Sequence, residues 1–286
     1  MTTRKGSSLE PTVYLSEVMF ELWGFGRPHD WSNRVGNKTW ETRAEICRTL
    51  DIHNLGAPKF LKLPHPDSGF DVCRLTDLED STSYVYGSGG DAVVFRRGGF
   101  RSDILILDPG ESAWVTTSDC PLVIVSDPAQ KRVFVIHASH RNLLHFGPSN
   151  YESMSILRHV LSLTVSPLRE VSASIVVGYK HVLLNPGHKK YGEWNKVLRK
   201  LICSYWGRYC YHDEDAGVLN FPRLITEQFE HLLIKEDQVC WDGVDTYADV
   251  DDKGQYVWHS FRRHQEGGGS LSGNPDNGFV ICNIVG

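Results

Sequence analysis

The sequence contains no CxxC pair and no uninterrupted apolar run long enough to cross a bilayer. Its seven cysteines are odd in number and irregularly spaced, which excludes a simple disulfide framework and favours a reducing compartment. The first twelve residues, MTTRKGSSLEPT, contain no apolar signal region. We therefore expect a cytoplasmic protein that does not bind membranes.

The chain also lacks an excess of basic residues. It has 30 Lys and Arg against 35 Asp and Glu, a net charge of −5. A mildly acidic total argues against broad electrostatic binding to nucleic acid. Because 286 residues can bury a substantial core and no repeat or linker interrupts them, we expect a single domain over residues 12–286. Residues 1–11 are polar and are expected to be flexible.

Apolar segments of strand length are separated in some places by helical patterns and in others by short turns. Such a mixture predicts an α+β fold with mixed sheets and flanking helices, rather than a regular βαβ array. The predicted strands are 13–23, 70–75, 91–96, 104–107, 112–118, 174–177, 239–248, 256–263 and 278–285. The predicted helices are 39–50, 151–163, 192–205 and 223–234, the last with Pro222 in its first turn.

The stretch SDCPLVIVSDPAQKRVFVIHASHR, residues 118–141, predicts a β-hairpin with its turn at Asp127-Pro128. If Asp127 pairs with Gln130, then Cys120 and His137 lie directly opposite each other. Their Cβ atoms would be about 4.5–5.5 Å apart on one face of the sheet. That distance suits a thiolate–imidazole pair or two ligands of one metal ion. A loop one residue shorter would shift the register by one and place the two side chains on opposite faces. Cys120 would then be an ordinary buried cysteine and His137 an ordinary strand histidine.

The same stretch resembles the A-D-C-L-P-V-x-x-x-D-P…V-x-x-x-H-A-G-W-R-G segment of the laccase-domain family, also known as polyphenol oxidase or peptidoglycan editing factor. The similarity extends over most of the chain. FLKLPHPDSGFDV corresponds to the family's L-x-Q-V-H-G loop and GGDAVVF to its A-D-A-L-V segment. NFPRLITEQF, VCWDGVDTYAD, HSFRR and GFVICNIV correspond to later motifs. The resemblance implies a laccase-domain-like sandwich, similar to cysteine hydrolases.

The resemblance also implies a set of site residues. The family's metal-binding His, Cys and His fall on His65, Cys120 and His137, and the Arg of H-A-G-W-R falls on Arg141. Asp91 is the candidate for an acid, a base or an orienting group. The candidates for binding phosphate or substrate are Arg141, Arg262, Arg263 and His140.

The sequence departs from the family pattern around the expected substrate pocket. His140 stands in place of Trp, Asn142 in place of Gly, and Asp245 in place of the first Cys of C-T-Y-C-D. The family's G-P-A-I-G-P stretch has no recognisable counterpart in VVGYKHVLLNPGHKKYG. These changes imply a substrate pocket that differs from the family's even if the metal centre is kept.

A His2Cys ligand set predicts zinc, with a fourth position left for water or substrate. Zinc lowers the pKa of bound water to roughly 7, which suits adenosine deamination, and the resemblance implies phosphorolysis of purine nucleosides. We therefore expect a zinc-dependent purine nucleoside phosphorylase that also deaminates adenosine, with purine nucleoside and phosphate as its small-molecule partners. Copper oxidation is disfavoured, because the chain has no H-x-H pair and none of its three methionines lies near the ligands in sequence.

Two other functions stay open. In the first, His137 activates Cys120 as the nucleophile of a metal-free amide hydrolase acting on peptidoglycan precursors. In the second, the chain binds nucleoside or metal without catalysis, as the altered H-A-S-H-R-N motif allows.

Overall fold

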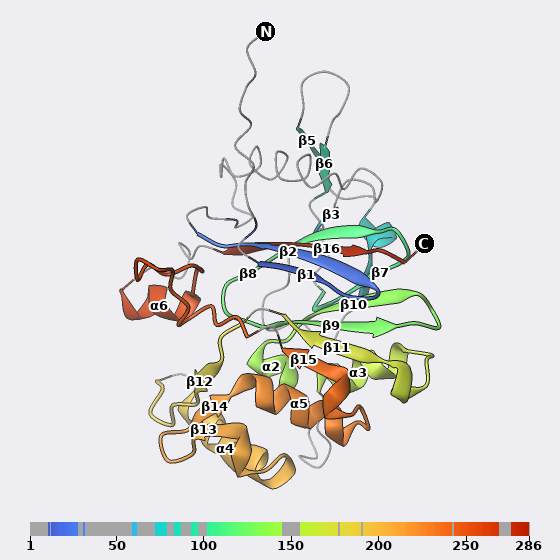
Figure 1. The fold of residues 1–286 in the computed structure, drawn as a ribbon. Helices are drawn as coiled ribbons and strands as arrows, with labels where there is room; N and C mark the ends of the chain where they lie inside the picture. Colours follow the sequence, from blue (N-terminus) through green and yellow to red (C-terminus); the bar gives the residue numbers. More distant parts are fainter. Residues whose placement is uncertain are drawn as a thin grey trace.

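The computed structural model describes residues 11, 13–27, 31, 59–61, 72–78, 83–86, 93–96, 102–144, 155–176, 178–189, 191–241, 243–268 and 276–285. Two large mixed sheets lie above one another, and helices cover the outer face of the second sheet (Figure 1). The predicted α+β fold is therefore confirmed. The predicted flexible N-terminus falls almost entirely outside the described residues, and the predicted helix at 39–50 lies wholly outside them.

The first sheet has five strands in the order β1-β2-β16-β8-β3. These are β1 (Val13–Ser16), β2 (Phe20–Phe25), β16 (Asn277–Asn283), β8 (Ser112–Thr117) and β3 (Lys59–Leu61). The neighbours pair antiparallel except β3 and β8, which are parallel. The last strand of the chain thus completes the sheet that the first strand begins.

The second sheet has six strands in the order β15-β11-β9-β10-β7-β4. These are β15 (Val239–Trp241), β11 (Ser172–Ile175), β9 (Leu122–Asp127), β10 (Arg132–His137), β7 (Ile104–Leu107) and β4 (Val72–Arg74). Both edge strands are parallel to their neighbours. Two small sheets complete the described strands: β12 (His181–Leu183), β14 (Val218–Asn220) and β13 (Tyr211–Asp213) form one, and β5 (Ser83–Tyr86) and β6 (Val93–Arg96) the other.

The central strands of the six-stranded sheet, β9, β10 and β7, are buried on both faces, and their side chains divide between two cores. On β9, Leu122 and Ile124 enter the core between the sheets, whereas Val123 and Val125 enter the core beneath the helices. Strands β7 and β10 alternate in the same way. A strand buried on both faces reads as a continuous apolar run, which explains the unbroken LVIV and VFVI segments.

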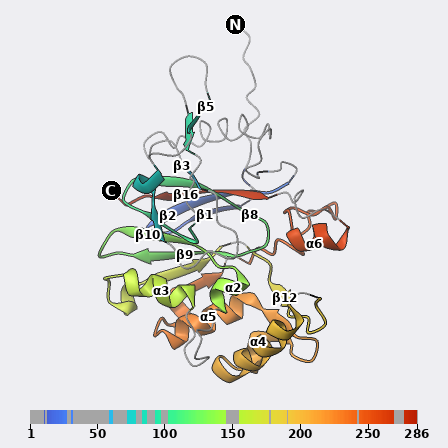
Figure 2. The ribbon, with the colours of Figure 1, turned by 180° about the vertical axis from the view of Figure 1, so that it is seen from behind.

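Helices form the layer beneath the six-stranded sheet (Figure 2). They are α2 (His140–Leu143), α3 (Ile156–Leu163), α4 (Gly192–Tyr205) and α5 (Phe221–His231). Helix α4 has the predicted bounds. Helix α3 begins at Ile156 rather than 151, because the Ser155 hydroxyl accepts a hydrogen bond from the Leu157 amide and caps the helix.

The predicted strand at 256–263 is wrong. Residues Phe261–Glu266 form helix α6, whose N-cap Ser260 accepts a hydrogen bond from the Arg263 amide. The alternating aromatic residues of YVWHSF are typical of a strand, but the helix begins at the cap and overrides that pattern. The strand predicted at 239–248 is also shorter, because β15 ends at Trp241.

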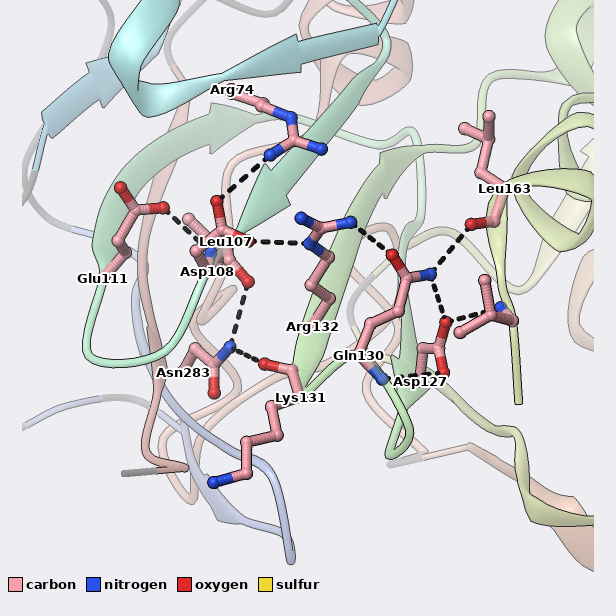
Figure 3. A network of polar contacts seen from close by, with 11 residues as sticks. Arg74, Leu107, Asp108, Glu111, Asp127, Gln130, Lys131, Arg132, Leu163 and Asn283 are labelled. Carbon is pink, nitrogen blue, oxygen red and sulfur yellow. Dashed lines mark hydrogen bonds and ion pairs between the residues drawn. The ribbon is translucent and has the colours of Figure 1, made fainter.

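The turn end of the β9–β10 hairpin is fixed by polar contacts (Figure 3). Arg132 Nε lies 2.7 Å from Asp108 Oδ1, and Arg74 Nη1 lies 3.4 Å from Asp108 Oδ2. Asn283 of β16 donates to the carbonyls of Leu107 and Lys131 at 2.9 and 2.8 Å. The asparagine thus joins the two large sheets at this end.

No helix among the described residues has the length and apolarity needed to cross a membrane.

Candidate cysteine–histidine site

The register of the β9–β10 hairpin differs from the predicted one by two residues. Asp127 pairs with Arg132 and Leu122 with His137, so Cys120 is not directly opposite His137. The turn is longer because Pro128 O accepts from the Lys131 amide at 3.1 Å, and Lys131 adopts a left-handed φ of 53° before β10 begins. Since side chains alternate with a period of two, this shift keeps Cys120 and His137 on the same face.

The two side chains meet diagonally across the open end of the hairpin. The Cys120 side chain lies beside the His137 ring and raises the pKa of that ring. The backbone supports this contact, because Ala138 N donates to Pro121 O at 2.8 Å and Thr117 Oγ1 donates to Cys120 O at 2.9 Å. Cys120 is half-buried, and the side chain of His137 is 12% exposed to solvent. The pair is therefore held firmly and remains partly open to solvent.

Asp103 completes the arrangement from the next strand. It precedes β7, whose Ile104 pairs with Ile136 of β10. Asp103 Oδ1 lies 2.9 Å from His137 Nδ1, and its carbonyl accepts from the His137 amide at 2.9 Å. The Asp103 side chain is only 1% exposed. With Nδ1 bound to the carboxylate, Nε2 is the ring nitrogen left for the sulfur.

This environment changes the protonation of the histidine. Burial alone lowers the pKa of His137, but the negative charge of Cys120 and the hydrogen bond to Asp103 outweigh it and raise the pKa to about 10. In the protein without metal, these groups therefore favour the protonated form of the His137 ring. Tyr179 lies next to this site, because its amide donates to Asp119 O at 2.9 Å, and burial is the main cause that raises the pKa of its phenol.

Two predicted site residues lie outside the described part of the chain, namely His65 and Asp91. Within the described ranges, no group of three His, Cys, Asp or Glu side chains is arranged to hold a metal ion. The three-ligand metal centre with His65 therefore stays a prediction.

The residues after His137 leave the sheet at once. Ser139 caps α2 by accepting from the Asn142 amide, so His140 and Arg141 are the first two residues of a helix. His140 therefore does not continue the strand that ends at His137. The ring of His140 packs edge-on against Trp194 of α4, with centroids 5.6 Å apart.

The two arginines of α6 have different surroundings. The guanidinium of Arg263 donates to the carbonyls of Tyr247 and Trp258 and lies 3.7 Å from the centroid of the Tyr256 ring. The guanidinium of Arg263 thus binds the segments that precede α6. The guanidinium of Arg262 keeps about a third of its exposure, pairing with Glu266 at 3.1 Å and donating to His181 O at 3.3 Å. Of the two, Arg262 is better placed for an anionic ligand.

The sequence-based reasoning missed Asp103 and Asp119. A signal for Asp103 was present, because Ser102-Asp103-Ile104-Leu105-Ile106 fits the A-D-A-L-V pattern at least as well as the segment at Asp91 does, with Leu two residues after Asp. Asp119 stands in the A-D-C motif next to Cys120, but its long-range contacts depend on segments that only the fold brings together.

No family model matches the chain, and no curated protein matches it. Solved structures do. The hypothetical protein YfiH of Bacillus licheniformis matches with a TM-score of 0.60 at 12% identity, over 92% of both chains. YlmD of Geobacillus stearothermophilus matches with a TM-score of 0.59 at 11% identity, over 92% of this chain and 91% of its own.

The Neisseria meningitidis protein NMB0706, described as a DUF152 protein, matches with a TM-score of 0.55 at 13% identity, over 94% of this chain and 98% of its own. All three structures belong to the laccase-domain group. The chain therefore has the laccase-domain fold, as its sequence resemblance predicts.

Proposed function

We propose that the chain is a zinc-dependent purine nucleoside phosphorylase, with adenosine deamination as a second reaction. The observation that supports this function is the contact of Cys120 with a His137 ring that Asp103 orients. The laccase-domain fold agrees with it. The identity to the solved structures is too low to carry substrate or reaction over to this chain.

The donor atoms fit a zinc ion. A cysteine sulfur and a histidine Nε2 are ordinary zinc ligands, and a carboxylate on Nδ1 is the usual support of a zinc-binding histidine. His65 is the proposed third ligand. When bound, zinc supplies an electrophilic centre and an acidic water molecule at this site.

The protein's own residues would bind and orient the reactants. In phosphorolysis, an oxygen of phosphate forms a bond to C1′ of the ribose while the bond from C1′ to the purine nitrogen breaks, and the purine leaves with a proton. We assign phosphate binding to Arg262, whose backbone amide donates to Asp119, the neighbour of Cys120, at 2.8 Å. Arg141 at the start of α2 is the second candidate for this role.

The test is a chromatographic screen of purine nucleosides, each incubated with and without phosphate, on protein of measured zinc content. We expect free base and ribose 1-phosphate only when phosphate is present, and inosine from adenosine without it. Cys120→Ser should abolish both, whereas Cys240→Ser, at an exposed cysteine, should not. Binding of nucleoside without any product would contradict the proposal and would favour a non-catalytic relative.

A second candidate function is a metal-free cysteine amide hydrolase. It is favoured by the order Asp103, His137, Cys120, in which a carboxylate orients the base and the base contacts the nucleophile. In this function Cys120 forms a thioester with the substrate's acyl group and His137 protonates the leaving amine. Hydrolysis of a peptidoglycan-derived peptide by zinc-free protein, lost in Cys120→Ser, would establish it in place of the phosphorylase.

A further inference from the structure

We propose that Asp119 is a positioning residue whose buried carboxylate ties the turn carrying Cys120 to helix α6 and to the turn at 245–248. The three segments together hold the Cys120 sulfur against His137. This inference concerns the placement of Cys120 and stands whether the site works with zinc or as a cysteine hydrolase.

The carboxylate of Asp119 accepts three hydrogen bonds from residues distant in the chain. Oδ1 accepts from Thr246 Oγ1 at 2.9 Å, and Oδ2 accepts from Ser260 Oγ at 3.1 Å and from the Arg262 amide at 2.8 Å. Asp119 is 7% exposed. Since a carboxylate has about four acceptor positions, protein donors occupy most of its capacity, which marks it as a tie between segments.

The backbone of Asp119 makes a further tie. Its carbonyl accepts from the Tyr179 amide at 2.9 Å, and the carbonyl of Gly178 accepts from the Thr246 amide at 3.0 Å. A Cβ added at Gly178 would meet Pro121 Cα at 2.9 Å. The chain at 178–179 therefore packs tightly between the Cys120 turn and the turn at Thr246.

The contacts of Asp119 constrain Cys120 because one peptide bond joins the two residues. Asp119 precedes the cysteine, so a shift of its main chain moves the sulfur relative to His137, which is fixed separately by Asp103. The loss of Asp119's hydrogen bonds would release the Cys120 turn from α6 without removing any group that contacts the sulfur. We therefore expect the reactivity of Cys120 to depend on a carboxylate that does not take part in the chemistry.

The chain offers a matched control at the other end of β9. Asp127 is also buried, and its carboxylate accepts from the amides of Val165 and Ser166 and from the Ser166 hydroxyl. It joins β9 to the segment after α3, at the end of the strand away from Cys120 (Figure 3). Asp119→Ala and Asp127→Ala thus remove comparable buried carboxylates, but only the first adjoins the cysteine.

The experiment measures the alkylation rate of Cys120 by iodoacetamide at pH 7, read by mass spectrometry of its peptide. The full chain is kept in chelator so that no metal covers the sulfur, and exposed Cys240 serves as the internal standard. We expect Asp119→Ala to slow Cys120 at least fivefold, because the released turn no longer holds the sulfur beside the His137 ring. Asp127→Ala should leave the rate within twofold, although both variants lower the melting temperature.

The conservative variant separates hydrogen-bond geometry from charge. In Asp119→Asn the amide oxygen can accept from Ser260 and Arg262, while the amide nitrogen donates to the hydroxyl of Thr246. We therefore expect a Cys120 rate within twofold of the unmodified protein. An asparagine variant as slow as the alanine variant would overturn the proposal, as would a normal rate in Asp119→Ala or an equal loss in Asp127→Ala.

If Asp119→Ala does not fold, Ser260→Ala provides the same test by removing one of the three bonds. Its control is Ser155→Ala, because Ser155 is also a buried helix cap and donates to the Gln228 side chain at 2.5 Å. Ser260→Ala should slow Cys120 at least threefold, and Ser155→Ala should not change it. Equal rates in the two serine variants would overturn the proposal.

Discussion

Asp103 Oδ1 lies 2.9 Å from His137 Nδ1, so a buried carboxylate on one strand orients an imidazole on the next. The same ring contacts Cys120. Strands β7, β9 and β10 bring the three groups together, although Asp103 comes before Cys120 in the chain and His137 after it. On the six-stranded sheet, Leu105, Leu122 and Val135 point into the space between the two large sheets, and each lies two residues from one of these site residues. The site therefore lies where that core reaches the open end of the hairpin.

Asp103→Asn should weaken the site without unfolding the protein. An asparagine can present its amide group to Nδ1 and stabilise the wrong tautomer of His137, which lowers zinc affinity or activity by about 10- to 100-fold. Zinc binding is measured by competition with a chromogenic chelator. Asp108→Asn, just after the same strand, removes a salt-bridged carboxylate at the other end of β7 and should leave zinc affinity unchanged. Equal affinities in the two variants would contradict the role of Asp103.

Asp127 should make stability depend on pH on the acid side. Burial raises the pKa of Asp127, but hydrogen bonds from Ser166, Val165 and Gln130 outweigh it and hold the pKa below its ordinary value of 3.8. The ionised form thus stabilises the fold fully above pH 3.8, and this contribution is lost as pH falls through the lower folded-state pKa. Asp127→Asn should lower the free energy of unfolding in urea at pH 7 by about 1–3 kcal/mol. The difference from the unmodified protein should shrink at pH 3, and a constant difference across pH would contradict the assignment.

Substitutions of the two arginines of α6 should have different effects. Replacing Arg263 should lower stability, whereas replacing Arg262 should weaken phosphate binding. Arg263→Lys cannot reach the carbonyls of Tyr247 and Trp258 together with the Tyr256 ring, and should cost about 1–3 kcal/mol of unfolding free energy. Arg262→Ala should raise the KM for phosphate at least tenfold with a melting temperature near that of the unmodified protein. A phosphate KM that responds to Arg263 and not to Arg262 would reverse the two roles.

Gly178 should tolerate no side chain. The added Cβ of Gly178→Ala would approach Pro121 Cγ to 2.7 Å, so the turn next to Cys120 must move. Overpacking of this kind costs about 1–3 kcal/mol, and we expect a matching loss of Cys120 reactivity. Gly267→Ala is the control, since its nearest contact of 3.4 Å is with the Arg263 carbonyl. Comparable losses of stability in both variants, measured by urea unfolding, would argue against close packing at Gly178.

Much of the fold could be predicted because its signals are local. The hairpin, helices α4 and α5 and strand β16 follow from apolar runs, Pro222 and turn residues that act within a few positions. Helix α6 could not be predicted from the aromatic alternation before it, because the hydroxyl of Ser260 determines where the helix begins.

The site was predicted less completely than the fold. Cys120 and His137 lie on the same face, as predicted, although the predicted register is wrong. The register differs by two residues, and side chains alternate with a period of two. Asp103 and Asp119 were missed because their partners lie on other elements, which a single strand's pattern does not reveal.

The most direct measurement of the central claim is the zinc content of four purified proteins, determined by mass spectrometry of the metal. We expect about one zinc ion per chain in the unmodified protein and in Cys240→Ser, and none in Cys120→Ser or His137→Ala. Zinc retained at full occupancy after loss of Cys120 would contradict it, as would an unmodified protein that cleaves purine nucleosides while free of metal.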